Sequence, residues 1–225
     1  MDGLISTSIN LRLLKSANKP RHLRKSVPVV FNATPAITET QQTELDLLPK
    51  ACAWWFSKPM EFLAQESSTY DAGFRESLLA VKKYIKEEGP FDGMLGFSQG
   101  AAFLLLLQIM MEHKLSGTVR ENNCLLSPQN FTDYDVGPIK FTILVAPFIS
   151  RCLLHQAIYV YKTSIPSLVV YGETDSVIPR EMSEEALDVF LSEPKVFVHD
   201  GGHYIPTHAD AKKIYTDIVS KFIEK

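Results

Sequence analysis

Residues 93–111, GMLGFSQGAAFLLLLQIMM, decide the fold class of this 225-residue chain. Met94–Phe97 is a short apolar run that predicts a strand, and Ala101–Met111 is apolar except for Gln108. The second run predicts a buried core helix, because its 11 residues fall well short of the roughly 20 that span a bilayer. Between the two runs, Gly96-Phe97-Ser98-Gln99-Gly100 matches G-x-S-x-G, a motif that holds its serine on a sharp turn from strand to helix.

Strands and helices alternate on both sides of this turn. Apolar residues at helical spacing predict helices over 74–88, 181–191 and 211–223. Short apolar runs predict strands over 27–31, 141–146, 168–171 and 195–198. Two of these strands are continuously apolar, as in strands that are covered on both faces. The pattern therefore predicts an α/β fold of the α/β-hydrolase type, with a mostly parallel sheet, helices on both faces and the functional site at the carboxyl ends of the strands.

The composition is that of an ordinary globular protein. Hydrophobic residues make up 45% of the chain, charged residues 22%, and the formal net charge is −3. These values exclude disordered, collagen-like and coiled-coil proteins, and they give no electrostatic reason to expect nucleic acid as a partner. We expect an irregular, basic N-terminal segment over residues 1–25 and a single domain over residues 26–225.

Signals for compartment and metal are weak. The N-terminal segment lacks the apolar core and cleavage site of a secretory signal, and the three cysteines are widely spaced without a C-x-x-C pair. We therefore expect a cytoplasmic protein without disulfides, metal or cofactor, with the nucleus left open. Mitochondrial targeting also stays open, because Asp2 is the only acid among several Arg, Lys and Ser residues.

A serine hydroxyl at such a turn becomes a nucleophile only when a histidine, oriented by a carboxylate, removes its proton. In this class of fold the acid and then the histidine follow the serine along the chain. Asp175 lies four residues beyond the predicted strand 168–171, and His203 lies on a loop after the strand 195–198. Glu173 and His199 remain the competing acid and base. Ser98, Asp175 and His203 are therefore the candidate catalytic residues.

Further motifs follow one another over about residues 24–225. They are Trp54-Trp55-Phe56, Gly89-Pro90-Phe91-Asp92-Gly93, the Gly96–Gly100 turn, Tyr171-Gly172-Glu173-Thr174-Asp175, and Gly201-Gly202-His203-Tyr204-Ile205-Pro206. This ordered set resembles the FSH family of serine hydrolases. The resemblance implies Ser98 as nucleophile, Asp175 as acid and His203 as base, with hydrolysis of medium- to long-chain acyl esters through an acyl-enzyme.

Residues near these loops are candidates for binding a small-molecule ester. The backbone N–H of Gln99, at the start of a helix, would donate to the oxyanion of the reacting ester. Aromatic side chains would line an acyl pocket, because ligand sites are mostly apolar. These are Phe97, Trp54, Trp55, Phe148 and Tyr204. The sequence makes no prediction about the oligomeric state.

The N-terminus departs from the family pattern. Family members open with a hydrophobic strand that ends in a His-Gly or similar pair, which helps to form the oxyanion hole. This chain begins Met1-Asp2-Gly3-Leu4 without a preceding strand pattern, so Leu4 is the only candidate for the second oxyanion donor. The departure leaves an alternative open, in which the chain is a weakly active or non-catalytic isoform that acts as a binding protein.

Overall fold

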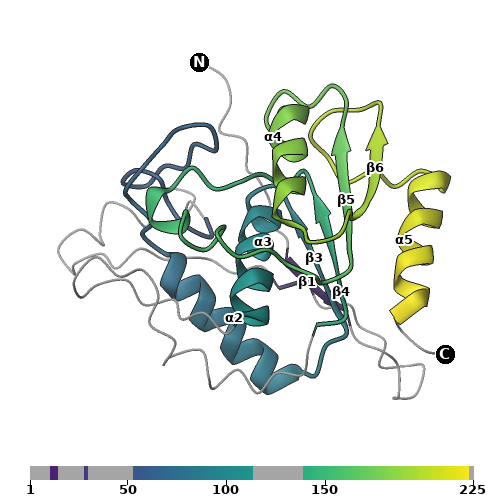
Figure 1. Ribbon diagram of the computed structural model, residues 1–225, viewed down its shortest axis with the longest axis horizontal. Coiled ribbons are helices and arrows are strands. Elements are labelled where there is room, and N and C mark those ends of the chain that lie inside the picture. The colour runs from purple at the N-terminus through teal and green to yellow at the C-terminus, as the bar shows by residue number, and fades with distance from the viewer. Residues whose placement is uncertain (1–10, 15–27, 30–52, 114–138, 223–225) are drawn as a thin grey trace, which may run out of the picture.

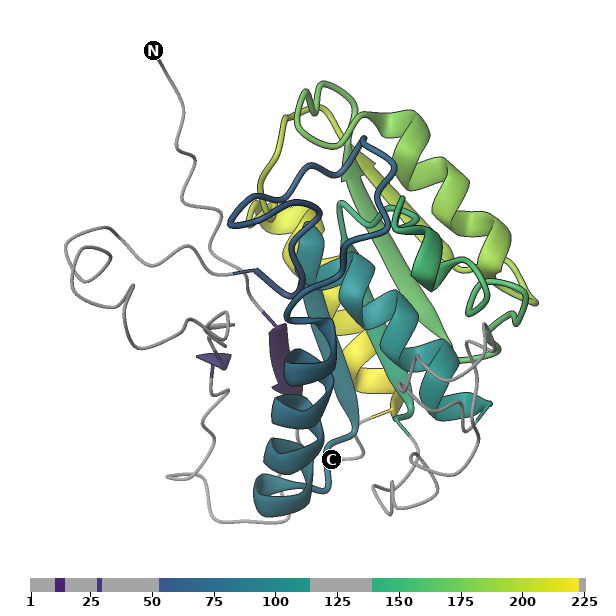
Figure 2. The ribbon, with the colours of Figure 1, turned by 90° about the vertical axis from the view of Figure 1, so that its left-hand side faces the viewer.

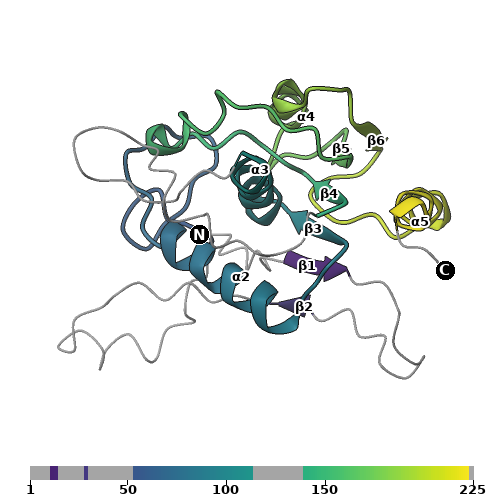
Figure 3. The ribbon, with the colours of Figure 1, turned by 60° about the horizontal axis from the view of Figure 1, so that its bottom comes forward.

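The computed structural model describes residues 11–14, 28–29, 53–113 and 139–222. Four parallel strands form the main part of one sheet: β3 (Gly93–Phe97), β4 (Phe141–Val145), β5 (Ser167–Gly172) and β6 (Lys195–His199). Two short strands extend it on the β3 side, β1 (Leu11–Leu14) and β2 (Pro28–Val29), in the order β2-β1-β3-β4-β5-β6. Figure 3 shows this sheet from its end, with helices on either side.

Helices cover both faces of the sheet, as the sequence predicted. α2 (Phe74–Glu88), α3 (Gln99–Glu112) and α4 (Arg180–Glu185) lie on one face, and α5 (Ala209–Phe222) lies on the other (Figure 1). The split follows from side-chain alternation along β4: Phe141, Ile143 and Val145 pack against α5, whereas Leu144 packs toward α3 and α4. The α/β fold with a mostly parallel sheet is therefore confirmed.

The helix α3 is the centre of the larger core. Every side chain from Gln99 to Met110 is buried, which explains why this helix is apolar on all sides rather than amphipathic. No helix in the described part of the chain has the length and hydropathy that crossing a bilayer requires.

Two expectations need correction. The N-terminal segment is not irregular throughout, because Leu11–Leu14 forms β1, which pairs antiparallel with β3 (Figure 2). Leu11, Arg12 and Leu13 alternate apolar and polar side chains, but this pattern is too short to predict a strand by itself, and β3 supplies the hydrogen-bonding partner. The predicted helix 181–191 is shorter, since α4 ends at Glu185 and a 3₁₀ turn, η5, continues over Ala186–Val189. The predicted strand 27–31 is described only at Pro28–Val29.

Candidate active site

Three side chains from three loops meet at the carboxyl edge of the parallel strands. Ser98 directly follows β3, Asp175 lies on the loop after β5, and His203 lies on the loop after β6. The Nε2 atom of His203 is 2.9 Å from Ser98 Oγ, and its Nδ1 atom is 2.8 Å from Asp175 Oδ2. The structure thus brings the three candidate catalytic residues into one hydrogen-bonded chain.

Asp175 is the anchor of this chain. Its side chain is 1% exposed, and its Oδ1 atom accepts the backbone N–H groups of Val177 and Ile178 at 2.9 Å each. Burial raises the pKa of Asp175, but the hydrogen bonds from His203 and the two backbone N–H groups outweigh burial and hold the pKa below its ordinary value. An ionised carboxylate only accepts, so the shared proton sits on His203 Nδ1 and the Nε2 lone pair faces Ser98.

Ser98 sits in a strained backbone conformation. Its φ is 55°, in the left-handed region that residues other than glycine rarely adopt. Long-range and local hydrogen bonds hold it there: the Ser98 N–H donates to Val145 O at 2.8 Å, and the Ser98 carbonyl accepts from Ala101 and Ala102. The turn therefore presents the hydroxyl to His203 while α3 starts at the next residue.

Gly96 is required for this turn to close. A Cβ atom at Gly96 would lie 2.5 Å from Gly100 O and 2.8 Å from the backbone of Ala101. We expect Gly96→Ala to lower the free energy of unfolding by about 3 kcal/mol, because backbone atoms would have to shift. Gly202→Ala is the control, since a Cβ there meets nothing closer than Thr174 O at 3.6 Å. Urea titration of both variants checks this prediction, and equal losses would contradict it.

The competing acid and base lie outside the hydrogen-bonded chain. The Glu173 carboxylate pairs with Arg180 at 2.7 Å, and half of its side chain is exposed. The Nδ1 atom of His199 accepts the Gly201 N–H at 3.2 Å, and its ring faces Tyr204. Glu173 thus contacts Arg180 of α4, and His199 contacts Gly201 and Tyr204.

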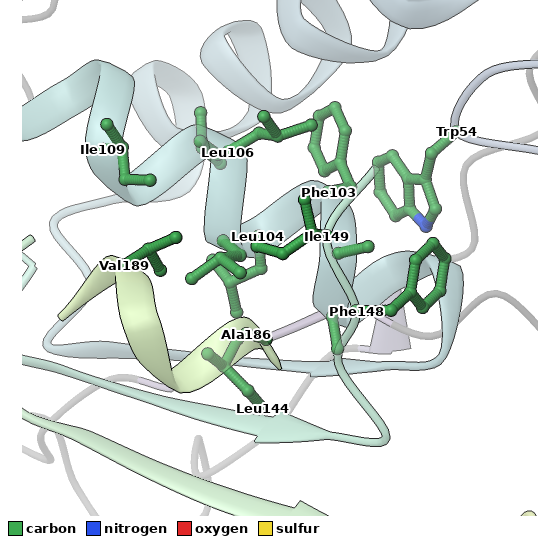
Figure 4. Packing of buried hydrophobic residues seen from close by; sticks show 14 of the residues in the cluster. Trp54, Phe103, Leu104, Leu106, Ile109, Leu144, Phe148, Ile149, Ala186 and Val189 are labelled. Atoms are coloured by element: carbon green, nitrogen blue, oxygen red, sulfur yellow. The ribbon is translucent and has the colours of Figure 1, made fainter. Parts of the chain in front are cut away.

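The five aromatic residues expected to contact substrate divide into two groups. Trp54, Trp55 and Phe148 are each 1% exposed and belong to the core, where Figure 4 shows Trp54 and Phe148 among packed side chains. α3 and its neighbours bury these three side chains, and their contact with substrate stays a prediction. Phe97 lies at the site with its ring centroid 4.7 Å from that of His203, and Tyr204 is 47% exposed.

Of the two candidate oxyanion donors, Gln99 lies in the described part of the chain and Leu4 does not. Gln99 is the first residue of α3, directly after Ser98, so its backbone N–H belongs to the free first turn of the helix. Leu4 lies outside the described residues. β1 runs antiparallel to β3, and its first residue, Leu11, pairs with Gly96.

Sequence reasoning missed two contributions. Val177 and Ile178 hold Asp175 through their backbone N–H groups, and an aspartate followed by a turn is a local signal that could have predicted this. The Gln99 side chain bonds the backbone of Trp54 and Trp55, and no local signal predicts it because the partners lie 45 and 44 residues away.

A polar cavity of about 550 Å³ lies beside Asp175. Its lining includes Glu173, Thr174, Ser176, Arg180 and Glu184, but neither Ser98 nor His203. In the described part of the chain, no group of three His, Cys, Asp or Glu side chains is placed to hold a metal ion.

Comparison with known proteins gives a family and a fold. The model of the family described as serine hydrolase (FSH1) matches residues 20–215. Esterase OVCA2 from Danio rerio is 36% identical over 214 residues, which cover 89% of this chain and 86% of that protein. Esterase OVCA2 from Xenopus tropicalis is 38% identical over 172 residues, covering 76% and 66% respectively.

Other relatives are longer than this chain. Esterase CG5412 from Drosophila melanogaster is 32% identical over 192 residues, and the match covers 85% of this chain but only 62% of that protein. Among solved structures, acyl-protein thioesterase 2 from Zea mays matches with a TM-score of 0.50 and 16% identity, over 76% of this chain and 73% of that one. At this identity the structural likeness concerns the fold alone.

Proposed function

The chain belongs to the FSH1 serine hydrolase family, and from this premise we propose that it hydrolyses carboxylic esters through an acyl-enzyme on Ser98. The observation that carries the proposal is the hydrogen-bonded chain from Asp175 through His203 to Ser98. Relatives that share a third of their residues over most of this chain are named esterases, which supports the same reaction class.

Each of the three hydrogen-bonded residues, Ser98, His203 and Asp175, has a role in the acylation step. Ser98 Oγ attacks the ester carbonyl carbon while its proton passes to His203 Nε2. Asp175 stabilises the imidazolium and keeps the ring oriented through Nδ1. The Gln99 N–H donates to the oxyanion of the tetrahedral intermediate. When the intermediate collapses, the bond to the alcohol breaks, and the alcohol leaves with the proton from His203.

In deacylation, water is the nucleophile and Ser98 is the leaving group. A water molecule gives its proton to His203 Nε2 and attacks the acyl carbon of the Ser98 ester. The second intermediate collapses, the acid is released, and Ser98 Oγ recovers the proton.

Fluorophosphonate labelling tests the proposal. The probe phosphonylates an activated serine, so we expect the intact folded protein to gain one adduct, located on Ser98 by peptide mass spectrometry. A well-folded protein that gains no adduct would contradict the enzyme proposal and favour the alternative, a binding protein of the same fold.

We also propose that the preferred esters carry medium- to long-chain acyl groups. This part rests on the family resemblance and on two aromatic side chains at the site: Phe97, whose ring centroid lies 4.7 Å from that of His203, and Tyr204, which is 47% exposed. The p-nitrophenyl esters of acetate, octanoate and palmitate test it. We expect kcat/KM to be higher for octanoate than for acetate, and a preference for acetate would overturn the chain-length proposal while leaving the esterase proposal intact.

A further inference from the structure

The side chain of Gln99 makes two hydrogen bonds to one backbone segment. Its Oε1 atom accepts the Trp54 N–H at 3.0 Å, and its Nε2 atom donates to the Trp55 carbonyl at 2.7 Å. Gln99 is only 6% exposed, so water does not compete freely for these groups. A single amide thus ties the first residue of α3 to residues 54–55, at two points.

The Trp54–Trp55 segment is itself firmly held. The Trp54 carbonyl accepts the hydroxyl of Ser77 on α2 at 2.8 Å, and the Trp54 ring stacks on Phe103 of α3 with centroids 4.3 Å apart. Both tryptophans are 1% exposed. Figure 2 shows the segment that precedes α2 beside the amino-terminal ends of α2 and α3. The segment is therefore buried and held by contacts with both α2 and α3.

The Trp54–Trp55 segment holds Gln99, the residue whose backbone N–H is the proposed oxyanion donor. The side-chain amide of Gln99 and its backbone N–H are both attached through the Gln99 Cα atom. Hydrogen bonds that hold the side-chain amide in place therefore also restrain the peptide group between Ser98 and Gln99. This peptide follows a residue with φ of 55°, which does not hold that conformation without outside contacts. An oxyanion donor works only when it is held in place before the reaction, and small misplacements cost large factors in rate.

We propose that the Gln99 side chain is a positioning residue that aligns its own backbone N–H in the oxyanion hole, with Trp54–Trp55 as its support. The inference rests on the proposed function, because it concerns the same reaction. In this proposal the two buried tryptophans support Gln99, a role that is compatible with their burial.

Gln99→Met tests the proposal, because methionine keeps the length and burial of the side chain but makes neither hydrogen bond. We expect kcat to fall about 10- to 100-fold with KM changed less than about threefold, since the lost alignment matters only in the transition state. Affinity for a trifluoromethyl ketone, which forms an oxyanion on Ser98, should fall in parallel with kcat/KM.

Gln108→Met is the matched control. Gln108 lies on the same helix, is 1% exposed, and its Oε1 atom accepts the Thr142 hydroxyl at 2.8 Å. The substitution is identical and also removes a buried amide, but it lies far along α3 from Ser98. We expect kcat within about twofold of wild type, whatever the change in thermal midpoint.

Gln99→Glu gives a second, pH-dependent test. A protonated carboxyl can accept from the Trp54 N–H and donate to the Trp55 carbonyl, whereas a carboxylate cannot donate. The variant therefore makes both hydrogen bonds only while its carboxyl is protonated, a form that burial favours. We expect the ratio of variant to wild-type kcat to rise as the pH falls from about 8 to about 6.

The outcomes separate this inference from the proposed function. A labelled, active wild type with unchanged kcat in Gln99→Met overturns the inference alone. Equal losses of kcat in Gln99→Met and Gln108→Met also overturn it, because they would reflect general destabilisation. If Gln99→Met does not fold, a kcat for Gln99→Glu that equals the wild-type value over the whole pH range overturns it instead. A folded wild type that is neither labelled nor active contradicts the proposed function and the inference together.

Discussion

Ser98→Ala is expected to lower kcat/KM for any accepted ester by about 10⁴- to 10⁶-fold. The reason is that His203 then has no hydroxyl to deprotonate, and water must attack the ester directly. Steady-state hydrolysis of a p-nitrophenyl ester measures the loss. We expect the variant to fold, because removing the Ser98 hydroxyl breaks the hydrogen bond to His203 Nε2 at 2.9 Å and removes no contact within the hydrophobic core.

Ser183→Ala is the matched control for Ser98→Ala. The Ser183 hydroxyl is fully buried and donates to the Pro147 carbonyl at 2.8 Å, away from the hydrogen-bonded chain of the active site. We expect Ser183→Ala to lose stability but to keep kcat/KM within about threefold. Residual hydrolysis by Ser98→Ala near the wild-type rate would place the nucleophile elsewhere and overturn the proposed mechanism.

Asp175→Asn is expected to lower kcat by about 10⁴-fold, because an amide at this position favours the tautomer of His203 that cannot accept the Ser98 proton. The Nε2 atom would then carry a hydrogen and point it at Ser98 Oγ. Glu173→Gln is the matched control, since Glu173 pairs with Arg180 at the surface and should change kcat less than about twofold. If Glu173→Gln were the more damaging change, the assignment of the acid would be wrong.

The same variant has a stability signature that depends on pH. The pKa of Asp175 lies below its ordinary value, so the ionised carboxylate stabilises the fold at every pH above the unfolded value of about 3.9. This contribution is lost as the pH falls through the lower, folded pKa. Urea titrations of wild type and Asp175→Asn should therefore show a difference in free energy of unfolding that is constant near neutrality and narrows below about pH 4.

The sequence predicted the parts of this protein that depend on local pattern. The run 93–111 predicted a strand, a tight turn and a buried helix, and the structure has β3 and α3 at these positions. Such patterns are readable because strand and helix periods, and the steric demands of a turn at Gly96, involve residues that are close in the chain.

Other parts could not be predicted because they depend on distant partners. The four-residue strand β1 is too short to be predicted from its own pattern, and its hydrogen-bonding partner is β3, which lies about eighty residues later. Trp54 and Trp55 look like substrate contacts in the sequence, yet Gln99, Ser77 and Phe103 bury them from distant positions. The sequence alone does not distinguish an aromatic residue that lines a pocket from one that fills a core.

The sequence by itself therefore determined the α/β class, the serine turn and the order of a serine, an acid and a histidine along the chain. The tertiary structure decided which acid and which histidine reach Ser98. Glu173 and Asp175, like His199 and His203, are neighbours in sequence and chemically alike. Only the packing of the loops after β5 and β6 sets the 2.8 Å and 2.9 Å contacts, which join residues 28 and 105 positions apart. Local periodicity carries no information about distances of that kind, because they arise when separate strands align in one sheet.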